Sequence, residues 1–330
     1  MPELFRARAV LKGRMPFFLL LTLLSDCSLA EADRAFVANA VKTWESVRTE
    51  SLRIEPSPLP RLIFFDERCA LDGERAFAHG GMIPLPDGKS VPAQLMTFAG
   101  SYDGQKPFLV QALAPVWRTH ERHRNNPDLD RLMRAVFVHE MTHTVQTRAF
   151  GARLTELEQQ YAIEGLNDDI VQNRMKSNAE YVKAFDEERA LLYRVASESG
   201  TELRKELARE VLQRAKARRA RYFTGDRAWL AEVEEIFLGM EGAANWAAYR
   251  AAMRDGASPK EAIDLINRGG RSWSQDEGLA LFLAIDALMP GEWQAKVFGA
   301  RATGVWKVLE EAVRPARPAA LVGQPSGTLY

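Results

Sequence analysis

The 330-residue chain has little cysteine and little histidine, with two of the first and five of the second. So few cysteines exclude a zinc site built from cysteine ligands. No sign of charge dominates either, because basic and acidic residues number 44 each, which gives no reason to expect nucleic acid or an anionic surface as partner. With 46% hydrophobic and 27% charged residues, the composition is that of a globular protein with a sizeable core.

A long apolar run is also missing, and the run near the N-terminus is too short for a stable membrane span. Pro16–Leu24 follows a basic leader over residues 6–14, as in an export signal. Ser28-Leu29-Ala30 fits the small-x-small rule for cleavage. The sequence therefore predicts an exported protein, periplasmic or secreted, whose mature chain begins at Glu31.

Two other interpretations of this segment remain open. Leu24-Ser25-Asp26-Cys27 is similar to a lipoprotein box, although Asp26 stands where a small residue is expected. A buried N-terminal helix is the second. If the leader is removed at Ala30, Cys69 is the one remaining cysteine and no internal disulfide forms. We then expect Cys69 to be a small packing residue.

One motif carries chemistry, the H-E-x-x-H of residues 139–143. Residues i and i+4 share a helix face, so His139 and His143 would point the same way and bind one metal ion. Glu140 projects from the flank of that face, where it reaches a water on the metal. From Val136 to Val145 no charge occurs except Glu140, which indicates a buried active-site helix rather than two surface histidines.

The helix around this motif has recognisable ends. Asn126 is a suitable N-cap and Pro127 suits the first helical position. The helix is expected to run to about Phe150, with Gly151 as its stop. Gln146 either continues the inward face or is solvated. That inward stripe consists of Leu132, Val136, His139 and His143.

The motif resembles the zincin metallopeptidases, and this resemblance implies a zinc ion (Zn2+), a water activated by Glu140 and a third protein ligand downstream. No histidine follows His143, and Gln146 and Ala149 stand where the metzincin pattern has its glycine and third histidine. A carboxylate is therefore expected as the third ligand, as in the gluzincin branch to which thermolysin belongs.

Glu241 is the preferred third ligand. It begins the segment Glu241-Gly242-Ala243-Ala244-Asn245-Trp246, which resembles the E-G-x-A-x-(W/Y) ligand helix of gluzincin-like families. A glutamate among small and apolar residues needs a strong partner, the small residues admit a second helix, and Asn245 could orient a ligand histidine. The alternatives are Glu164, which forms an E-x-x-x-D pattern with Asp168, and then Glu188 and Glu277.

The whole pattern predicts an α+β fold that is predominantly α, with a small N-terminal sheet packed on the motif helix. A helix over 32–50 precedes strands at 62–65, 91–98 and 108–113, of which the last is a substrate-binding edge or an inner strand. Helical periodicity follows near 153–163, 178–197, 200–222, 227–254, 258–267 and 276–288. The expected parts are a signal peptide (1–30), an α+β part (31–125), a helical metallopeptidase-like part (126–313) and a loose tail (314–330).

These features predict an exported zinc-dependent hydrolase, a metallopeptidase acting on a peptide or protein with Glu140 as base. Because no downstream histidine exists, Tyr249, Tyr193 or an arginine would have to stabilise the oxyanion. Arg218 or Arg219 could bind a substrate carboxylate, although both suit an exposed helix face. Two alternatives remain: a zinc hydrolase of non-peptide amides, and a non-catalytic binding or scaffold protein with a structural or vestigial metal. The oligomeric state is not predicted.

Overall fold

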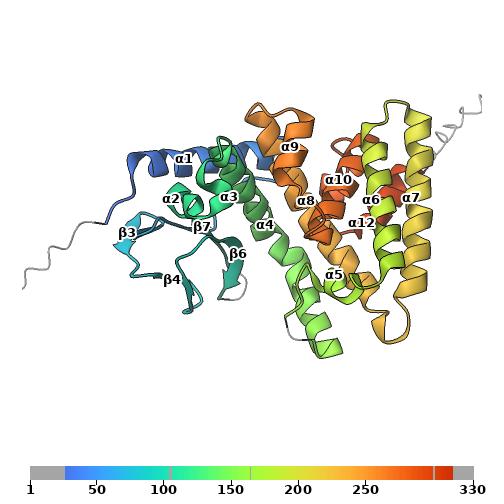
Figure 1. The fold of residues 1–330 in the computed structure, drawn as a ribbon, viewed down its shortest axis with the longest axis horizontal. Helices are drawn as coiled ribbons and strands as arrows, with labels where there is room; N and C mark the ends of the chain where they lie inside the picture. Colours follow the sequence, from blue (N-terminus) through green and yellow to red (C-terminus); the bar gives the residue numbers. More distant parts are fainter. Residues whose placement is uncertain (1–26, 104–105, 164, 300–301, 315–330) are drawn as a thin grey trace, which may run out of the picture.

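A computed structural model of the chain describes residues 27–103, 106–163, 165–299 and 302–314. Most of the expected signal peptide and nearly all of the expected tail lie outside these ranges. The predicted fold class is confirmed, because the strands all precede residue 113 and every regular element after it is a helix. In Figure 1 the sheet lies at one end of the molecule, the α6–α7 hairpin lies at the other, and α4 runs between them.

A mixed five-stranded sheet has the order β3-β2-β1-β7-β6. β1 (Arg61–Phe65) and β7 (Lys106–Ala112) are parallel neighbours, and β6 (Thr97–Tyr102) pairs antiparallel with β7. The predicted substrate-binding edge at 108–113 is therefore an inner strand, since β1 and β6 cover its two sides. β6 is the free edge beside the helices.

Three strands were not predicted: β2 (Cys69–Asp72) and β3 (Arg75–Ala78), which extend the sheet beyond β1, and β4 (Met82–Pro84), which lies in a separate ribbon. The single strand expected at 91–98 is also divided. Its first part is β5 (Ser90–Pro92), paired with β4 (Met82–Pro84) in a separate ribbon, and its last residues begin β6. Proline at the end of β5 has no N–H, which limits further pairing there.

The first helix, α1 (Glu31–Ser46), continues into a π-helical turn at Val47–Ser51 and matches the helix predicted over 32–50. The motif helix α4 (Leu129–Tyr161) begins with Asp128 rather than Asn126 as its N-cap. Asn126 instead accepts a hydrogen bond from the Asp128 N–H at 2.9 Å, which fixes the turn before the helix.

The predicted helix stop at Gly151 is wrong. α4 continues through this glycine for ten further residues, and Leu157 on that extension is fully buried in a cluster with Phe237. Burial of this face offsets the modest helix penalty of one glycine. The helix ends at Ala162, whose φ of 50° reverses the chain.

The centre of the helical part is α8 (Leu230–Arg254), which packs against both α4 and α10 (Trp273–Leu288). The expected close approach occurs at Gly242, where an added Cβ would lie 2.6 Å from the Gly278 carbonyl oxygen. Outside this core are α6 (Ala179–Ser197) and α7 (Thr201–Tyr222). The shorter helices are α2 (Ala114–Thr119), α3 (Glu121–Arg124), α5 (Ile170–Met175), a 3-10 turn (Gly225–Arg227), α9 (Pro259–Ile266), α11 (Gln294–Val297) and α12 (Val305–Ala312).

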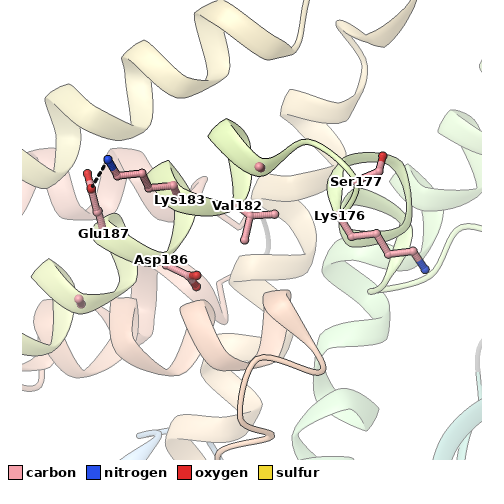
Figure 2. A pocket seen from close by; sticks show the side chains of 8 residues that line it. Lys176, Ser177, Val182, Lys183, Asp186 and Glu187 are labelled. Atoms are coloured by element: carbon pink, nitrogen blue, oxygen red, sulfur yellow. Dashed lines mark ion pairs between the residues drawn. The ribbon is translucent and has the colours of Figure 1, made fainter.

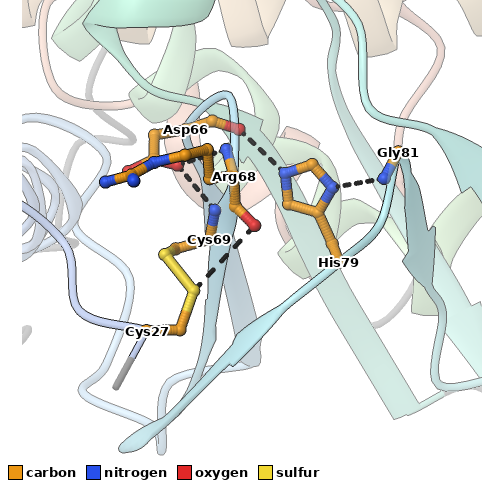
Figure 3. The surroundings of a disulfide bond; sticks show 6 residues. All are labelled: Cys27, Asp66, Arg68, Cys69, His79 and Gly81. Carbon is orange, nitrogen blue, oxygen red and sulfur yellow. Dashed lines mark hydrogen bonds between the residues drawn. A yellow bond between two sulfur atoms is a disulfide. The ribbon is translucent and has the colours of Figure 1, made fainter. Parts of the chain in front are cut away.

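The two cysteines form a disulfide that ties Cys27 to Cys69 at the start of β2 (Figure 3). The expected unpaired Cys69 is thus not what the structure has. Cleavage after Ala30 would remove Cys27, and a lipid on Cys27 would occupy the same sulfur, so each excludes the bond. The nearby His79 is structural: its Nδ1 accepts from the Gly81 N–H at 3.0 Å, and its Nε2 lies 3.1 Å from the Asp66 carbonyl oxygen.

We expect Cys69→Ser to lower the free energy of unfolding of the oxidised protein by about 2–4 kcal/mol, because the bond closes a long loop in the unfolded chain. Denaturant titration with and without reductant measures this loss. Under reducing conditions the variant should match the wild type. If the stability of the wild type does not change with reductant, or if mass spectrometry shows that the mature chain begins at Glu31, the bond is absent from the mature protein.

Candidate metal centre

His139, His143 and Glu241 meet where α4 and α8 pack together. Their candidate ligand atoms all lie within 4.8 Å of one another. The two histidine Nε2 atoms are 3.0 Å apart, and each is 3.3 Å from a different oxygen of Glu241. The structure thus brings the preferred carboxylate of the sequence analysis to the histidine pair.

Two of the other carboxylates considered as third ligand lie elsewhere in the structure. Glu188 and Glu277 lie in a buried ion cluster around Arg218. Glu164 lies outside the described residues. Asp168, its partner in the E-x-x-x-D pattern, accepts a hydrogen bond from Gln275 at 3.2 Å, and burial together with the charge of Glu241 raises its pKa.

Two amides orient the histidine rings. Asn245 Oδ1 lies 2.8 Å from His139 Nδ1, and Gln146 Oε1 lies 2.8 Å from His143 Nδ1. The NH2 group of Asn245 donates to the Gln275 carbonyl and that of Gln146 to the Met240 carbonyl, so both amide oxygens must face the rings. Each Nδ1 is therefore a donor, which leaves each Nε2 as the ring atom that faces Glu241 and is available to a metal ion.

Such a group fits a divalent cation. Two lone pairs 3.0 Å apart repel unless a proton or a cation lies between them. Without a metal, the charge and hydrogen bond of Glu241 outweigh burial and raise the pKa of His143 to about 9, and the same pairing holds the pKa of Glu241 far below its ordinary value despite burial. Two imidazoles and one carboxylate are a known three-ligand set for catalytic zinc.

Glu140 lies on the flank of the ligand pair and faces the sheet. Its Oε2 accepts a hydrogen bond from the Ala99 N–H of β6 at 3.0 Å. Burial raises the pKa of Glu140, while the neighbouring histidines act in the opposite direction. A carboxyl group whose pKa is moved toward neutrality is suited to both accepting and donating a proton.

The Ala99 N–H is one of the backbone groups of β6 that make no hydrogen bond to β7. The Ala112 N–H donates to the Met96 carbonyl, so even-numbered residues of β6 bond to β7 in this antiparallel pair. The backbone N–H and C=O groups of the odd-numbered residues of β6, with Ala99 in the middle, therefore point away from β7. The open edge of the sheet lies beside Glu140, an arrangement that suits an extended peptide.

A cavity of about 330 Å³ opens beside these groups and includes His139, Glu140 and Asn245 in its lining. Neither Tyr249 nor Tyr193 lines it. The ring of Tyr249 packs with apolar residues of α9 instead. A larger hollow of about 640 Å³ lies over α6 and the turn that precedes it (Figure 2), but its lining is remote in sequence from the motif and contains none of the candidate ligand residues.

The exposed position expected for Arg218 is wrong, and both Arg218 and Arg219, named as possible ligands of a substrate carboxylate, already pair with acids of the protein. The Arg218 side chain is 1% exposed and is paired with Glu188 and Glu234. Arg219 is paired with Glu234 and Glu235. Charge repeats along α7 indicated a solvated face, but the helix turns Arg218 inward toward acids supplied by other helices.

Two functional positions were missed or left open by the sequence. Ala99 acts through its backbone N–H, which no side-chain pattern reveals. Gln146 is 1% exposed and bonds His143, so the solvated interpretation is wrong. Its spacing of three residues from His143 was the available signal.

The chain matches no protein-family model, and neither the curated proteins nor the solved structures show a significant similarity to it. Within the described part of the chain, no helix is both long enough and apolar enough to cross a membrane. The support for a metal site therefore comes from the geometry of His139, His143 and Glu241.

We expect Gln146→Leu to weaken zinc binding about 10- to 100-fold, because His143 loses the acceptor that fixes its ring and tautomer. Competition with a chromogenic chelator measures the dissociation constant. Gln294→Leu is a matched control, since Gln294 is also buried and donates to a carbonyl, that of Ser51, in another part of the fold. Equal zinc affinity of the two variants would contradict the role of Gln146.

Proposed function

We propose that this protein is an exported zinc-dependent hydrolase, a metallopeptidase of the gluzincin-like kind. The observation that carries the proposal is the convergence of His139, His143 and Glu241 beside a fourth residue, Glu140, that touches an open sheet edge. A purely structural metal site requires ligands but no neighbouring base. The free edge of β6 favours a peptide over a small amide as substrate.

In the proposed reaction, different residues bind the metal ion, transfer the proton and position the substrate. His139, His143 and Glu241 would hold a zinc ion, which when bound would polarise the scissile carbonyl and make a water molecule more acidic. Glu140 takes the proton of the attacking water and delivers it to the leaving amine. One Glu140 oxygen is held by the Ala99 N–H, which leaves the other oxygen for the proton. β6 binds the substrate backbone in extended form.

Export is part of the proposal. The apolar N-terminal run supports it, and so does the Cys27–Cys69 disulfide, because such bonds persist in oxidising compartments. The disulfide favours a mature chain that retains Cys27 over one that begins at Glu31. N-terminal sequencing of the exported protein distinguishes the two.

Metal removal tests the function directly. The purified protein is expected to contain about one zinc ion per chain and to cleave peptides in a broad library. Chelation should abolish cleavage, and equimolar zinc should restore it. His143→Ala is expected to bind no zinc at this site and to remain inactive after zinc addition. A folded wild-type protein that takes up no zinc, or a zinc-loaded one that hydrolyses no amide, would refute the proposal.

A further inference from the structure

The cavity beside Glu140 is strongly basic. Arg122 enters its lining from α3, and Arg268 and Arg271 enter from the loop between α9 and α10. The acids of the lining are Glu140 and Asp264. Asp264 is already paired with Lys260 at 2.5 Å, so it does not balance the arginines.

The three guanidinium groups have no acidic partner in the described ranges, where no carboxylate lies within 4.0 Å of them. All three arginines are exposed to solvent, so their guanidinium groups are accessible to a ligand that enters the cavity. Burial, and then the nearby positive charges of His120, Arg122 and Arg268, lower the pKa of His123 in the same lining. The cavity thus concentrates unneutralised cations within a lining shared with His139 and Glu140.

The loop that carries two of the arginines is held in place. The Asp276 carboxylate, 1% exposed, accepts hydrogen bonds from the backbone N–H groups of Arg268 at 2.7 Å and Gly270 at 2.5 Å. Arg268 Nε lies 3.3 Å from Gln275 Oε1, and Arg271 Nε donates to the Arg268 carbonyl at 3.0 Å. Among the residues that the structure describes, the remaining guanidinium nitrogens of Arg268 and Arg271 have no protein acceptor, so planar donor groups are kept available on a fixed loop.

We propose that this cavity is a subsite for a carboxylate of the substrate, bound by Arg268 and Arg271 with support from Arg122, next to the scissile bond. The inference rests on the proposed hydrolase function and names its substrate class: peptides that present a carboxylate close to the scissile bond. The carboxylate is either an aspartate or glutamate side chain or the C-terminus of the peptide, and both present the same planar anion to a guanidinium group.

Binding of small probes tests the subsite without requiring catalysis. The probes are succinic, glutaric and adipic acid monohydroxamates and the corresponding terminal amides, added to the zinc-loaded protein and measured by titration calorimetry. The hydroxamate group of every probe is expected to bind the metal ion, and each acid differs from its amide by one negative charge. We expect at least one acid to bind about tenfold or more tightly than its amide, because charge-assisted hydrogen bonds to arginine are strong.

Arginine variants test whether the loop between α9 and α10 causes the difference in affinity between acid and amide. Arg268→Ala with Arg271→Ala should remove the preference for the acid and leave affinity for the amide unchanged. Arg34→Ala, at an exposed arginine of α1 outside the cavity, is the matched control and should keep the preference. Peptide pairs then identify the source of the carboxylate. Loss of cleavage on C-terminal amidation indicates the chain terminus, and loss on exchange of glutamate for glutamine indicates a side chain.

Equal binding of acid and amide by the zinc-loaded protein, or an acid preference that survives the double variant, would overturn the inference while leaving the hydrolase proposal intact. A protein that binds zinc and the acidic hydroxamates but cleaves no peptide would retain the subsite and lose the proposed activity. A protein that binds no zinc would overturn both, and metal analysis identifies that case separately.

Discussion

Replacement of Glu140 by glutamine is expected to lower kcat by about 10²- to 10⁴-fold, the usual contribution of a positioned general base. Glutamine has nearly the same shape and its amide oxygen can still accept the Ala99 hydrogen bond, but it cannot take a proton. The three proposed ligands are untouched. Zinc content and the substrate KM should therefore stay close to those of the wild type.

The measurement pairs metal analysis with steady-state kinetics on one cleaved peptide. Glu156→Gln is the matched control, because Glu156 lies on the same helix, is 63% exposed and pairs with Arg153. That variant should keep full activity. If the Glu140→Gln protein holds zinc and cleaves at the wild-type rate, another group is the base and the proposed mechanism fails. If it loses zinc, Glu140 has a structural role at the metal instead.

The candidate ligand set, His139, His143 and Glu241, was accessible from the sequence because each of these residues belongs to a local pattern. The i,i+4 spacing of His139 and His143 fixes their common face on any α-helix. The small residues after Glu241 predict a close helix contact, and the structure has that contact between Gly242 and Gly278. Local patterns of this kind predict side-chain positions because the backbone sets the periodicity of a helix.

Non-local partners were not accessible. The pairing of Cys27 with Cys69, the edge position of β6 and the inward turn of Arg218 all depend on which distant segments meet. The charge spacing along α7 is typical of a solvated face and suits the exposed pair of Glu210 and Arg214, at 2.7 Å. It gave the wrong environment for Arg218 one turn later, because the acids that bury Arg218 come from α6, α8 and α10.

This buried ion cluster supports the second large prediction. Arg218 bonds both oxygens of Glu188 at 3.0 Å, donates to Tyr181 Oη at 2.6 Å and meets Glu234 at 2.5 Å. Glu277 is fully buried beside it, with its nearest oxygen 3.8 Å from the guanidinium group. One arginine therefore holds together acids from three helices.

Replacement of Arg218 by methionine is expected to lower the free energy of unfolding by about 3–5 kcal/mol, because it leaves buried carboxylates without their cation. Urea titration followed by circular dichroism measures the loss. Arg214→Met is the matched control, since Arg214 is on the same helix, is 44% exposed and pairs with exposed acids. Its effect should stay within about 0.5 kcal/mol. Similar losses for the two variants would contradict the importance of the buried cluster.

The pH dependence of Glu277→Gln separates charge from packing in this cluster. Burial, and then the charge of Glu188, raise the pKa of Glu277 well above its ordinary 4.5, against the opposing effect of Arg218. Between pH 4.5 and the raised value, the unfolded chain releases this proton and the folded chain retains it. Rising pH therefore favours unfolding by up to about 1.4 kcal/mol per pH unit for this one group.

The Glu277→Gln variant cannot ionise at this position, so it should gain stability relative to the wild type as the pH rises above about 4.5. Below that pH both carry a neutral group, and the two curves should converge. Urea midpoints recorded from pH 4 to pH 8 test this difference. Parallel curves would mean that Glu277 is ionised in the folded protein at neutral pH, and that Arg218 with its neighbours stabilises three buried negative charges rather than two.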